Sequence, residues 1–526
     1  MLKRSTRRWL AGLGVAGAFV AASAAPAAAD PTPADVTLAE VQEAKGFGLF
    51  ANNVTVAPGG PEKWVTLRAL TDQPLTEYTV TVDRGAVDDF AEVQVTDGPG
   101  LCKEDKAVIT CEVRNAEPEQ PVIQFPVLPL DGSKPGQEGE LAFTVTTPGG
   151  ASASFRSTVT IGEGVDLVSD TALALTGRPG ETMKARLAVA NRGETTVDGS
   201  VLLVWGAYAL SPSKRYENCE YGTGGPNFYT PNMFACTFDD LLKPGAGARV
   251  DAGFGFTVPG DAWAPDEQVG FAVWLTPADW AEARADFDFS GDKGTDGMLK
   301  LEPTDIPGTL SSAAQTDVDP YNNETMVTIK VKGNQKADVA ADGATVTAKV
   351  GKTMPLEVGF TNNGPAAINT GGNGIFTAAV VTVPKGTTVV KAPENCFDIE
   401  AEEGGDLGKP GGSVYACFVD GIVGKGKKAT FPFSLRIDKA GALTGEVELF
   451  HSDASEGRGE DLNKANDIAK ILVNDSDGGG EGGGDGGTLP ITGSSTGLIA
   501  GIGALLLVAG VGGYLVAKRR RTRFVA

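Results

Sequence analysis

The side chains that could perform covalent chemistry in this chain are few. It holds one histidine, His451, with six cysteines and 67 acidic residues. A serine or cysteine nucleophile needs a base beside it, which here would have to be His451. His451 follows the alternating Val447 and Leu449, near the end of an expected strand, and no nucleophile is marked beside it. We interpret it as a surface or strand-edge histidine and predict that the protein is not an enzyme.

Acidic residues could cleave a carbohydrate as a pair, but among so many no pair stands out by its spacing. A wall-attached enzyme acting on carbohydrate is therefore only a remote alternative.

One sequence pattern has features of a metal-binding loop. Residues 286–292, Asp-Phe-Asp-Phe-Ser-Gly-Asp, look like the first half of a calcium loop, in which oxygen ligands alternate before a glycine turn. Gly297 takes the twelfth position, where such a loop has a bidentate glutamate. We favour a strand with Phe287 and Phe289 buried, and we expect no metal and no cofactor.

The six cysteines fall into three close pairs. No CxxC or histidine-rich spacing points to zinc. Six cysteines allow 15 connectivities, but their clustering in an exported chain favours three short-range disulfides, one per domain. The predicted bridges are Cys102–Cys111, Cys219–Cys236 and Cys396–Cys417.

The elements that position these residues follow from an internal repeat. Gly180-Glu181-Thr182-Met183 and Gly351-Lys352-Thr353-Met354 are followed, at equal spacings, by apolar residues and by Asn191-x-Gly193 or Asn362-x-Gly364. Glu-Asn-Cys then recurs at 217–219 and 394–396. Repetition over this length predicts two copies of one domain, at 165–333 and 336–474. The first of these would contain an extra segment from about Pro259 to Pro307.

The local pattern is that of β-strands. Short runs such as Leu356, Val358 and Phe360 alternate with polar positions and end at Asn-x-Gly turns. A more divergent unit at 35–163 shows the same alternation at Tyr78, Val80 and Val82. The one short helix candidate is 278–285. We predict an all-β chain of three tandem antiparallel β-sandwiches.

The two ends of the chain read as export signals. Residues 1–29 have a basic start, an apolar run and small residues before a cleavage point between Ala29 and Asp30, which predicts a signal peptide. At the other end, a Gly-rich acidic linker at 475–488 precedes Leu489-Pro490-Ile491-Thr492-Gly493. An apolar run at 498–517, long enough for a transmembrane helix, and a basic tail at 518–526 follow.

This C-terminal order resembles the cell-wall sorting signal of Gram-positive surface proteins. The resemblance implies that a sortase cuts between Thr492 and Gly493 and joins Thr492 to peptidoglycan. It implies a wall-anchored protein with a transient membrane-anchored precursor. An ordinary C-terminal membrane anchor is the alternative.

The unit at 336–474 is similar to the immunoglobulin-like conserved repeats of bacterial surface proteins. The similarity rests on Thr361-Asn362-Asn363-Gly364-Pro365 and on the turn Val383-Pro384-Lys385-Gly386. It implies a sandwich fold with a stalk or adhesive role and no chemistry. Lys–Asn isopeptide cross-links occur in some wall-anchored adhesins, but the sequence does not identify a partner set for one.

The loop between Cys219 and Cys236 is a candidate ligand loop. Tyr221, Phe228 and Tyr229 lie there among glycines and asparagines, the mixture found in antibody paratopes. The alternative is that these rings pack the core.

Charge and composition narrow the function classes. The net charge of −22 argues against nucleic acid as a partner. We expect an adhesion or ligand-presenting protein of the cell wall, which meets a host or envelope ligand. The alternative is a structural spacer of the envelope that binds no ligand.

Overall fold

The structure is a computed structural model that describes residues 47–474. Within this range, the segments 72–76, 96–99, 115–120, 224–229, 288, 304–313, 370–375, 402–405, 420 and 453–460 are not described. The expected signal peptide, linker, sorting motif, membrane helix and basic tail all lie outside the described residues and stay predictions. In the part of the chain that is described, no helix has the length and apolar character needed to span a membrane.

The described chain is dominated by antiparallel strands, which confirms the all-β prediction. The alternation seen in the sequence is the burial pattern of the strands: Tyr78, Val80 and Val82 point inward from one of them. Leu356 and Phe360 do the same from another. Side chains of a strand face opposite sides in turn, so one face of each strand enters a core.

The first pair of sheets encloses one apolar core. Valines, phenylalanines and leucines from both sheets form a single buried cluster, so the two sheets pack as a sandwich. One sheet has the order β1 (Phe47–Ala51), β3 (Lys63–Thr71), β8 (Pro121–Pro129), β5 (Ala91–Val93). The other has the order β2 (Val54–Val56), β10 (Ser152–Ile161), β9 (Glu138–Thr146), β4 (Glu77–Asp83), β7 (Val108–Arg114), β6 (Gly100–Asp105).

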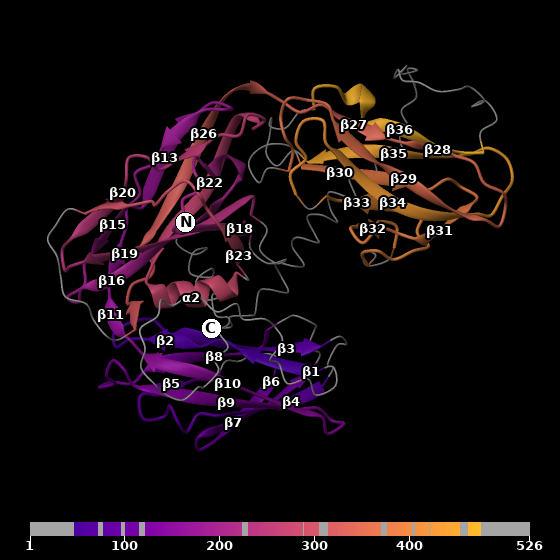
Figure 1. Cartoon of the computed structure of the whole chain (residues 1–526). Coiled ribbons are helices and arrows are strands. Elements are labelled where there is room, and N and C mark those ends of the chain that lie inside the picture. The colour runs from indigo at the N-terminus through magenta and orange to yellow at the C-terminus, as the bar shows by residue number, and fades with distance from the viewer. Residues whose placement is uncertain are drawn as a thin grey trace, which may run out of the picture. The chain divides into compact units, whose positions relative to one another are not determined.

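The last pair of sheets repeats this strand order, as the labels in Figure 1 let the reader follow. Its four-stranded sheet runs β27 (Val339–Asp342), β29 (Thr353–Asn362), β34 (Lys428–Ile437), β31 (Thr387–Lys391). Its six-stranded sheet runs β28 (Ala344–Val346), β36 (Ile468–Val473), β35 (Leu443–Ser452), β30 (Phe376–Thr382), β33 (Val414–Cys417), β32 (Cys396–Asp398). In both sandwiches the second strand pairs in parallel with the last one. The unit that looked divergent in sequence therefore has the topology of the last one.

The middle part is built on a larger, seven-stranded sheet. Its order is β13 (Ala172–Gly177), β26 (Glu324–Gln335), β22 (Ala264–Leu275), β16 (Val197–Gly206), β19 (Asn232–Leu242), β18 (Cys219–Thr223), β23 (Ser290–Lys293). Smaller sheets accompany it: β12 (Leu167–Val168), β15 (Ala188–Asn191), β20 (Gly247–Val250), β24 (Leu301–Pro303); β14 (Thr182–Lys184), β21 (Gly255–Thr257), β17 (Ser211–Pro212); and β11 (Glu163–Val165) with β25 (Gln315–Asp317).

Part of the segment expected to be an insertion belongs to this sheet. Strand β22 lies next to β16, with Val201 opposite Leu275, and so occupies an interior position. The additional elements are helix α2 (Pro277–Asp286), β23 and β24. The helix agrees with the candidate at 278–285. It begins at Pro277 because Thr276 caps its first turn by accepting a hydrogen bond from the Asp279 backbone N–H.

The chain divides into two compact units. The first comprises Met1–Gly177, Glu181–Val258 and Gln268–Lys330, which include the first sandwich, most of the seven-stranded sheet and helix α2. The second comprises Arg178–Gly180, Pro259–Glu267 and Val331–Ala526. Within the second unit, Trp263 joins the core that contains Ala337 and Leu356.

Candidate functional site

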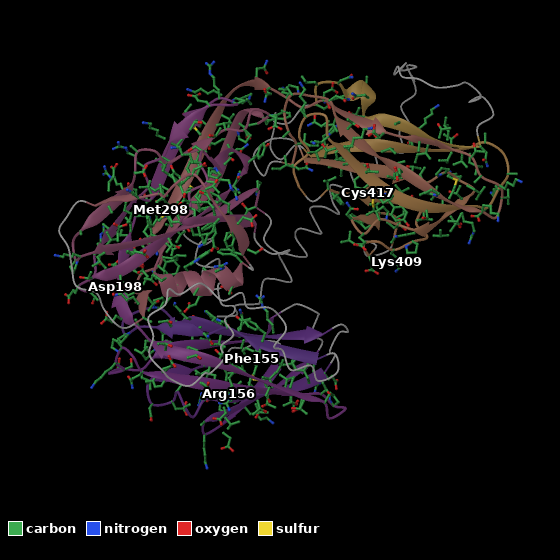
Figure 2. The ribbon with its side chains drawn as sticks, viewed as in Figure 1. Phe155, Arg156, Asp198, Met298, Lys409 and Cys417 are labelled. Atoms are coloured by element: carbon green, nitrogen blue, oxygen red, sulfur yellow. A yellow bond between two sulfur atoms is a disulfide. The ribbon has the colours of Figure 1, made fainter. Side chains whose placement is uncertain are left out.

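The three predicted disulfides are confirmed. Each joins residues that face each other on neighbouring antiparallel strands: β6 with β7, β18 with β19, and β32 with β33. The bridges are Cys102–Cys111, Cys219–Cys236 and Cys396–Cys417, with Cα–Cα distances of 4.0, 3.9 and 4.1 Å. Cys417 is labelled in Figure 2. The bridges hold the sheet ladder together and leave no described cysteine free to act as a nucleophile.

The Glu-Asn-Cys repeat has a structural explanation. Asn218 donates from its side-chain amide to the carbonyl of Thr237, and Asn395 donates in the same way to Phe418. Thr237 and Phe418 directly follow the second cysteine of each pair. The asparagine therefore extends the ladder by one bond beside each disulfide.

The Asn-x-Gly repeat is explained in the same way. Asn362 is fully buried; its amide donates to the carbonyls of Ala366 and Val423, and its carbonyl oxygen accepts from the Gly364 N–H. Asn191 makes the equivalent three bonds. A Cβ on Gly364 would lie 2.2 Å from the Asp338 nitrogen, so glycine is required there. These repeats are folding determinants rather than binding residues.

The predicted ligand loop loses one of its three rings. Tyr221 is 7 % exposed, stacks on Phe234 and donates its hydroxyl to the carbonyl of Lys214. The Arg215 guanidinium lies 4.4 Å from the centre of the Tyr221 ring. Tyr221 is therefore a core residue and not part of a ligand surface, because strand β18 turns it into the sandwich. Phe228 and Tyr229 lie outside the described residues.

The half calcium loop begins in the helix. Asp286 is the last residue of α2, and Phe287 and Phe289 are buried against the seven-stranded sheet. Burial of the two phenylalanines is as predicted. The expected strand is wrong for the start of this segment, because the helix continues to Asp286 and β23 starts only at Ser290.

A group of buried charges is the strongest polar feature of the first unit. Lys63, at the start of β3, places its Nζ atom 2.7 Å from Asp279 Oδ1 and 2.7 Å from Glu282 Oε2 of helix α2. These three side chains are only 17, 11 and 13 % exposed. The Nε atom of Arg68 in β3 and both carboxylate oxygens of Asp286 in α2 are also buried, and the Arg68 charge acts on Asp286. We call these five residues the α2–β3 charge cluster.

Apolar contacts fix the helix that presents the acids. Ala283 and Phe287 pack with Val201, Met233 and Val273 on the seven-stranded sheet. Asp279, Glu282 and Asp286 are spaced three and four residues apart, which puts them on one face of the helix. The first sandwich supplies both bases from β3, so the charge cluster joins the two parts of the first unit.

Asp279 and Glu282, the two acids that face Lys63, accept further hydrogen bonds with their carboxylate oxygens. Glu282 Oε1 accepts the backbone N–H of Thr55 at 2.7 Å, which adds a second link to the first sandwich. Asp279 accepts from the Thr316 hydroxyl at 2.6 Å and from the Asp317 N–H at 3.0 Å. Asp279 is therefore held as an anion by one cation and several donors.

Burial and ion pairing shift the pKa values of these groups in opposite directions. Burial alone would lower the pKa of Lys63, but attraction to Asp279 and Glu282 outweighs it and raises that pKa. Burial would raise the pKa of Asp279, but the Lys63 charge lowers it. Burial raises the pKa of Glu282 to about 7 and, against the pull of Arg68, that of Asp286 to about 9.

The cluster is suited to an ion pair rather than to covalent chemistry. An amide between Lys63 and Asp279 would require a neutral amine and a protonated acid. The raised pKa of Lys63 and the lowered pKa of Asp279 favour the opposite, unreactive forms. A buried pair of this kind resists separation, because either partner alone would be left as an uncompensated charge.

Sequence reasoning missed the α2–β3 charge cluster. Lys63 and Asp279 are 216 residues apart, and a pattern confined to one element cannot show their contact. The available signal was the acidic stripe of Asp279, Glu282 and Asp286 on a helix that also buries Ala283. An acidic stripe on a partly buried helix indicates a cationic partner elsewhere in the chain.

Comparison with known proteins gives only weak structural likenesses. No protein-family model and no curated protein matches the chain. Similar solved structures include Escherichia coli alpha-2-macroglobulin activated by porcine elastase, with 12 % identity and a TM-score of 0.15 over 81 % of this chain and 32 % of that one. The chain thus spans about a third of that protein.

Two further solved structures show the same kind of likeness. The I-band fragment I67–I69 from titin has 8 % identity and a TM-score of 0.12 over 81 % of this chain and 96 % of that one. The D00–D0 domain of intimin has 10 % identity and a TM-score of 0.16 over 43 % of this chain and 91 % of that one. At these values the similarity carries no argument. The chain has its own architecture, that of an all-β protein of antiparallel sheets, three of which have a disulfide between neighbouring strands.

Proposed function

We propose that this chain is an exported cell-wall protein whose β-sandwiches act as a stiff spacer of the envelope. The sorting-signal resemblance at 489–526 supports covalent attachment through Thr492, with a sortase and peptidoglycan as partners. Disulfides in the first sandwich, in the seven-stranded sheet and in the last sandwich support an oxidising location outside the cytoplasm. The signal peptide expected at 1–29 supports the same route.

The α2–β3 charge cluster is the observation that carries the spacer role. Domains joined only by a linker move relative to one another by default. Here Lys63 is held by Asp279 and Glu282, and Thr55 donates to Glu282, so the first sandwich is tied to helix α2 by buried polar contacts. A spacer needs such joints because its function is to hold a distance.

The surface of the described residues also favours a spacer over an adhesin. The large exposed apolar side chains come from different strands and loops, and the aromatic one among them is Tyr321: Val269, Met298, Tyr321, Met326, Val350, Val390, Leu407, Leu462 and Ile468. Met298 is labelled in Figure 2. Scattered apolar residues are ordinary, whereas binding surfaces gather them into patches.

Cell fractionation tests the anchoring. Thr492→Ala should move the protein from the wall into the membrane or the medium, because the sortase then no longer recognises the residue whose carbonyl it would attack. Thr488→Ala, just outside the motif, is the matched control and should leave the protein in the wall. Recovery of the Thr492→Ala protein covalently attached to purified peptidoglycan would refute the proposal.

A capture experiment separates the spacer from the adhesin. The adhesive alternative now rests on Phe228 and Tyr229. The full chain and its Phe228→Ala/Tyr229→Ala variant should capture the same components of envelope or host extracts if the protein is a spacer. Capture by the natural chain that the double variant abolishes, at equal thermal stability, would establish a ligand loop and displace the spacer role.

A further inference from the structure

The only histidine of the chain lies between two aspartates that the sequence does not place near it. His451 is near the end of β35, and Asp461 and Asp467 lie in the connection that leads to β36. The Leu449 N–H donates to the Asp467 carbonyl, which holds the end of this connection against β35. All three side chains belong to the second unit, and we call them the His451 cluster.

The imidazole is oriented by a buried hydroxyl. His451 Nδ1 lies 3.0 Å from the Thr377 hydroxyl, and Thr377 faces His451 across strands β30 and β35. This contact directs Nε2 toward Asp467, whose Oδ1 atom is 3.4 Å away. At this separation the two atoms form a hydrogen bond that is longer than the usual N–H···O range of about 2.7–3.2 Å. Two atoms bound to one tetrahedral zinc ion, each about 2.0–2.2 Å from it, lie roughly 3.3–3.5 Å apart.

Asp461 is also held in place. Its Oδ2 atom accepts the Val339 N–H at 2.8 Å, and its Oδ1 atom accepts the Asn463 N–H at 3.0 Å. Oδ1 also accepts the Val339 N–H at 3.3 Å, whereas Oδ2 keeps a further lone pair for a ligand bond. The donor atoms of His451, Asp461 and Asp467 all lie within 4.8 Å of one another.

The cluster differs from a solvated group of surface acids. The side chains of His451 and Asp467 are 12 and 15 % exposed, and Asp461 is 6 % exposed as a residue. Two carboxylates brought together with so little water repel each other unless a proton or a cation lies between them. A protonated His451 would supply one positive charge, whereas a divalent ion would supply two and would take all three donors.

We propose that His451, Asp461 and Asp467 bind one divalent transition-metal ion, with Zn²⁺ preferred. Imidazole nitrogen selects zinc over magnesium and calcium, and zinc accepts a mixture of nitrogen and carboxylate oxygen in a four-coordinate site. A water molecule would take the fourth position. Thr377 would act as a positioning residue, because a hydroxyl at Nδ1 fixes the ring that offers Nε2 to the metal.

The metal ion would cross-link strands at one end of the last sandwich. It would join β35, through His451, to the residues just before β36, and through the Asp461–Val339 bond to β27. Metal binding to the folded chain would add to the stability of this sandwich in proportion to the logarithm of free zinc.

Titration calorimetry tests the site on the full chain, produced without a histidine tag and treated with a chelator. Zn²⁺ should bind with one ion per chain, more tightly than Mn²⁺ or Ca²⁺ tested in parallel. His451→Gln and Asp467→Asn should each weaken zinc binding at least tenfold. Asp406→Asn, which changes an exposed acid of the same unit, is the control and should leave binding unchanged.

Chemical modification gives a second readout that needs no variant. Because His451 is the only histidine, the absorbance change of imidazole on treatment with diethyl pyrocarbonate reports on this residue alone. Saturating Zn²⁺ should slow the modification at least tenfold, since Nε2 is then bound to the metal. An unchanged modification rate with zinc, or zinc binding that is equally tight in His451→Gln, would overturn the proposal.

Discussion

Buried charge without full pairing is the main feature at the scale of single residues. Asp286 has two buried carboxylate oxygens without a hydrogen-bond partner, and burial raises its pKa to about 9. Asp279, only seven residues earlier, is fully partnered and its pKa is lowered. The same helix thus carries one acid that is stabilised as an anion and one that is stabilised as the neutral acid.

Replacing Asp286 by its neutral isostere should stabilise the protein at alkaline pH. The unfolded chain loses the Asp286 proton near pH 4 and the folded chain near pH 9, so the folded state binds more protons between these values and loses stability as the pH rises. Asp286→Asn should raise the unfolding temperature at pH 8 and change it little at pH 4. Asp89→Asn, at an exposed position, is the control. Equal unfolding temperatures of Asp286→Asn and the natural chain at pH 8 would contradict this assignment.

The ion pair of Lys63 should remain an ion pair. The intact mass of the mature, non-reduced chain should be lower than that of the fully reduced chain by the six hydrogens of three disulfides. No further water molecule should be missing, because Lys63 stays protonated and Asp279 ionised. Loss of one water, mapped to a cross-linked peptide containing Lys63, would show that an amide forms instead.

At the scale of elements, the repeated units of the chain share two features, strand order and buried asparagines. The first and last sandwiches share the order of all their strands, and the two Asn-x-Gly turns share three side-chain hydrogen bonds. These contacts explain why the motif recurs in the sequence without any ligand to preserve it.

Truncation of one such asparagine should cost several hydrogen bonds. Asn362→Ala should lower the free energy of unfolding of the last sandwich by ~2–3 kcal/mol, since it leaves buried backbone groups without partners. Asn363→Ala, next to it but exposed, should change that free energy by less than about 0.5 kcal/mol. Denaturant unfolding measures both; equal effects would mean that the buried amide does not support the turn.

The sequence allowed the local elements to be predicted, but not the long-range contacts. Alternation at Tyr78 and Val80 predicted strands, and close spacing predicted the disulfides, because both signals are local. The sequence did not show that the first and last sandwiches share one topology, because their strands correspond in how they pair and not in residue type. The Lys63–Asp279 and His451–Asp467 contacts were missed because the residues involved are brought together only by the fold. Tyr221 was misjudged because an aromatic residue near a disulfide fits both a binding loop and a core.

At the scale of the whole molecule, the acids with raised pKa set the response to pH. Burial raises the pKa of Glu282 and of Asp317 to about 7 and that of Asp286 to about 9. All three lose protons in the unfolded chain first, so each makes the first unit less stable as the pH rises from 5 to 8. Asp279 acts in the opposite direction, but only below pH 4, and Lys63 acts in the same direction as the three acids, but only above pH 10. Calorimetry should therefore show the unfolding temperature of the first unit falling between pH 5 and pH 8, and a rise would contradict the burial of these acids.

The α2–β3 charge cluster should make the first unit a single stiff body. Spin labels on Glu112 of the first sandwich and on Asp240 of β19, both exposed, allow the distance distribution between them to be measured by double electron–electron resonance. The natural chain should give one narrow distribution. Lys63→Met should broaden it, because Asp279 and Glu282 lose their shared cation, whereas Lys103→Met at an exposed position should not. A broad distribution in the natural chain, or an equally narrow one in Lys63→Met, would contradict the claim.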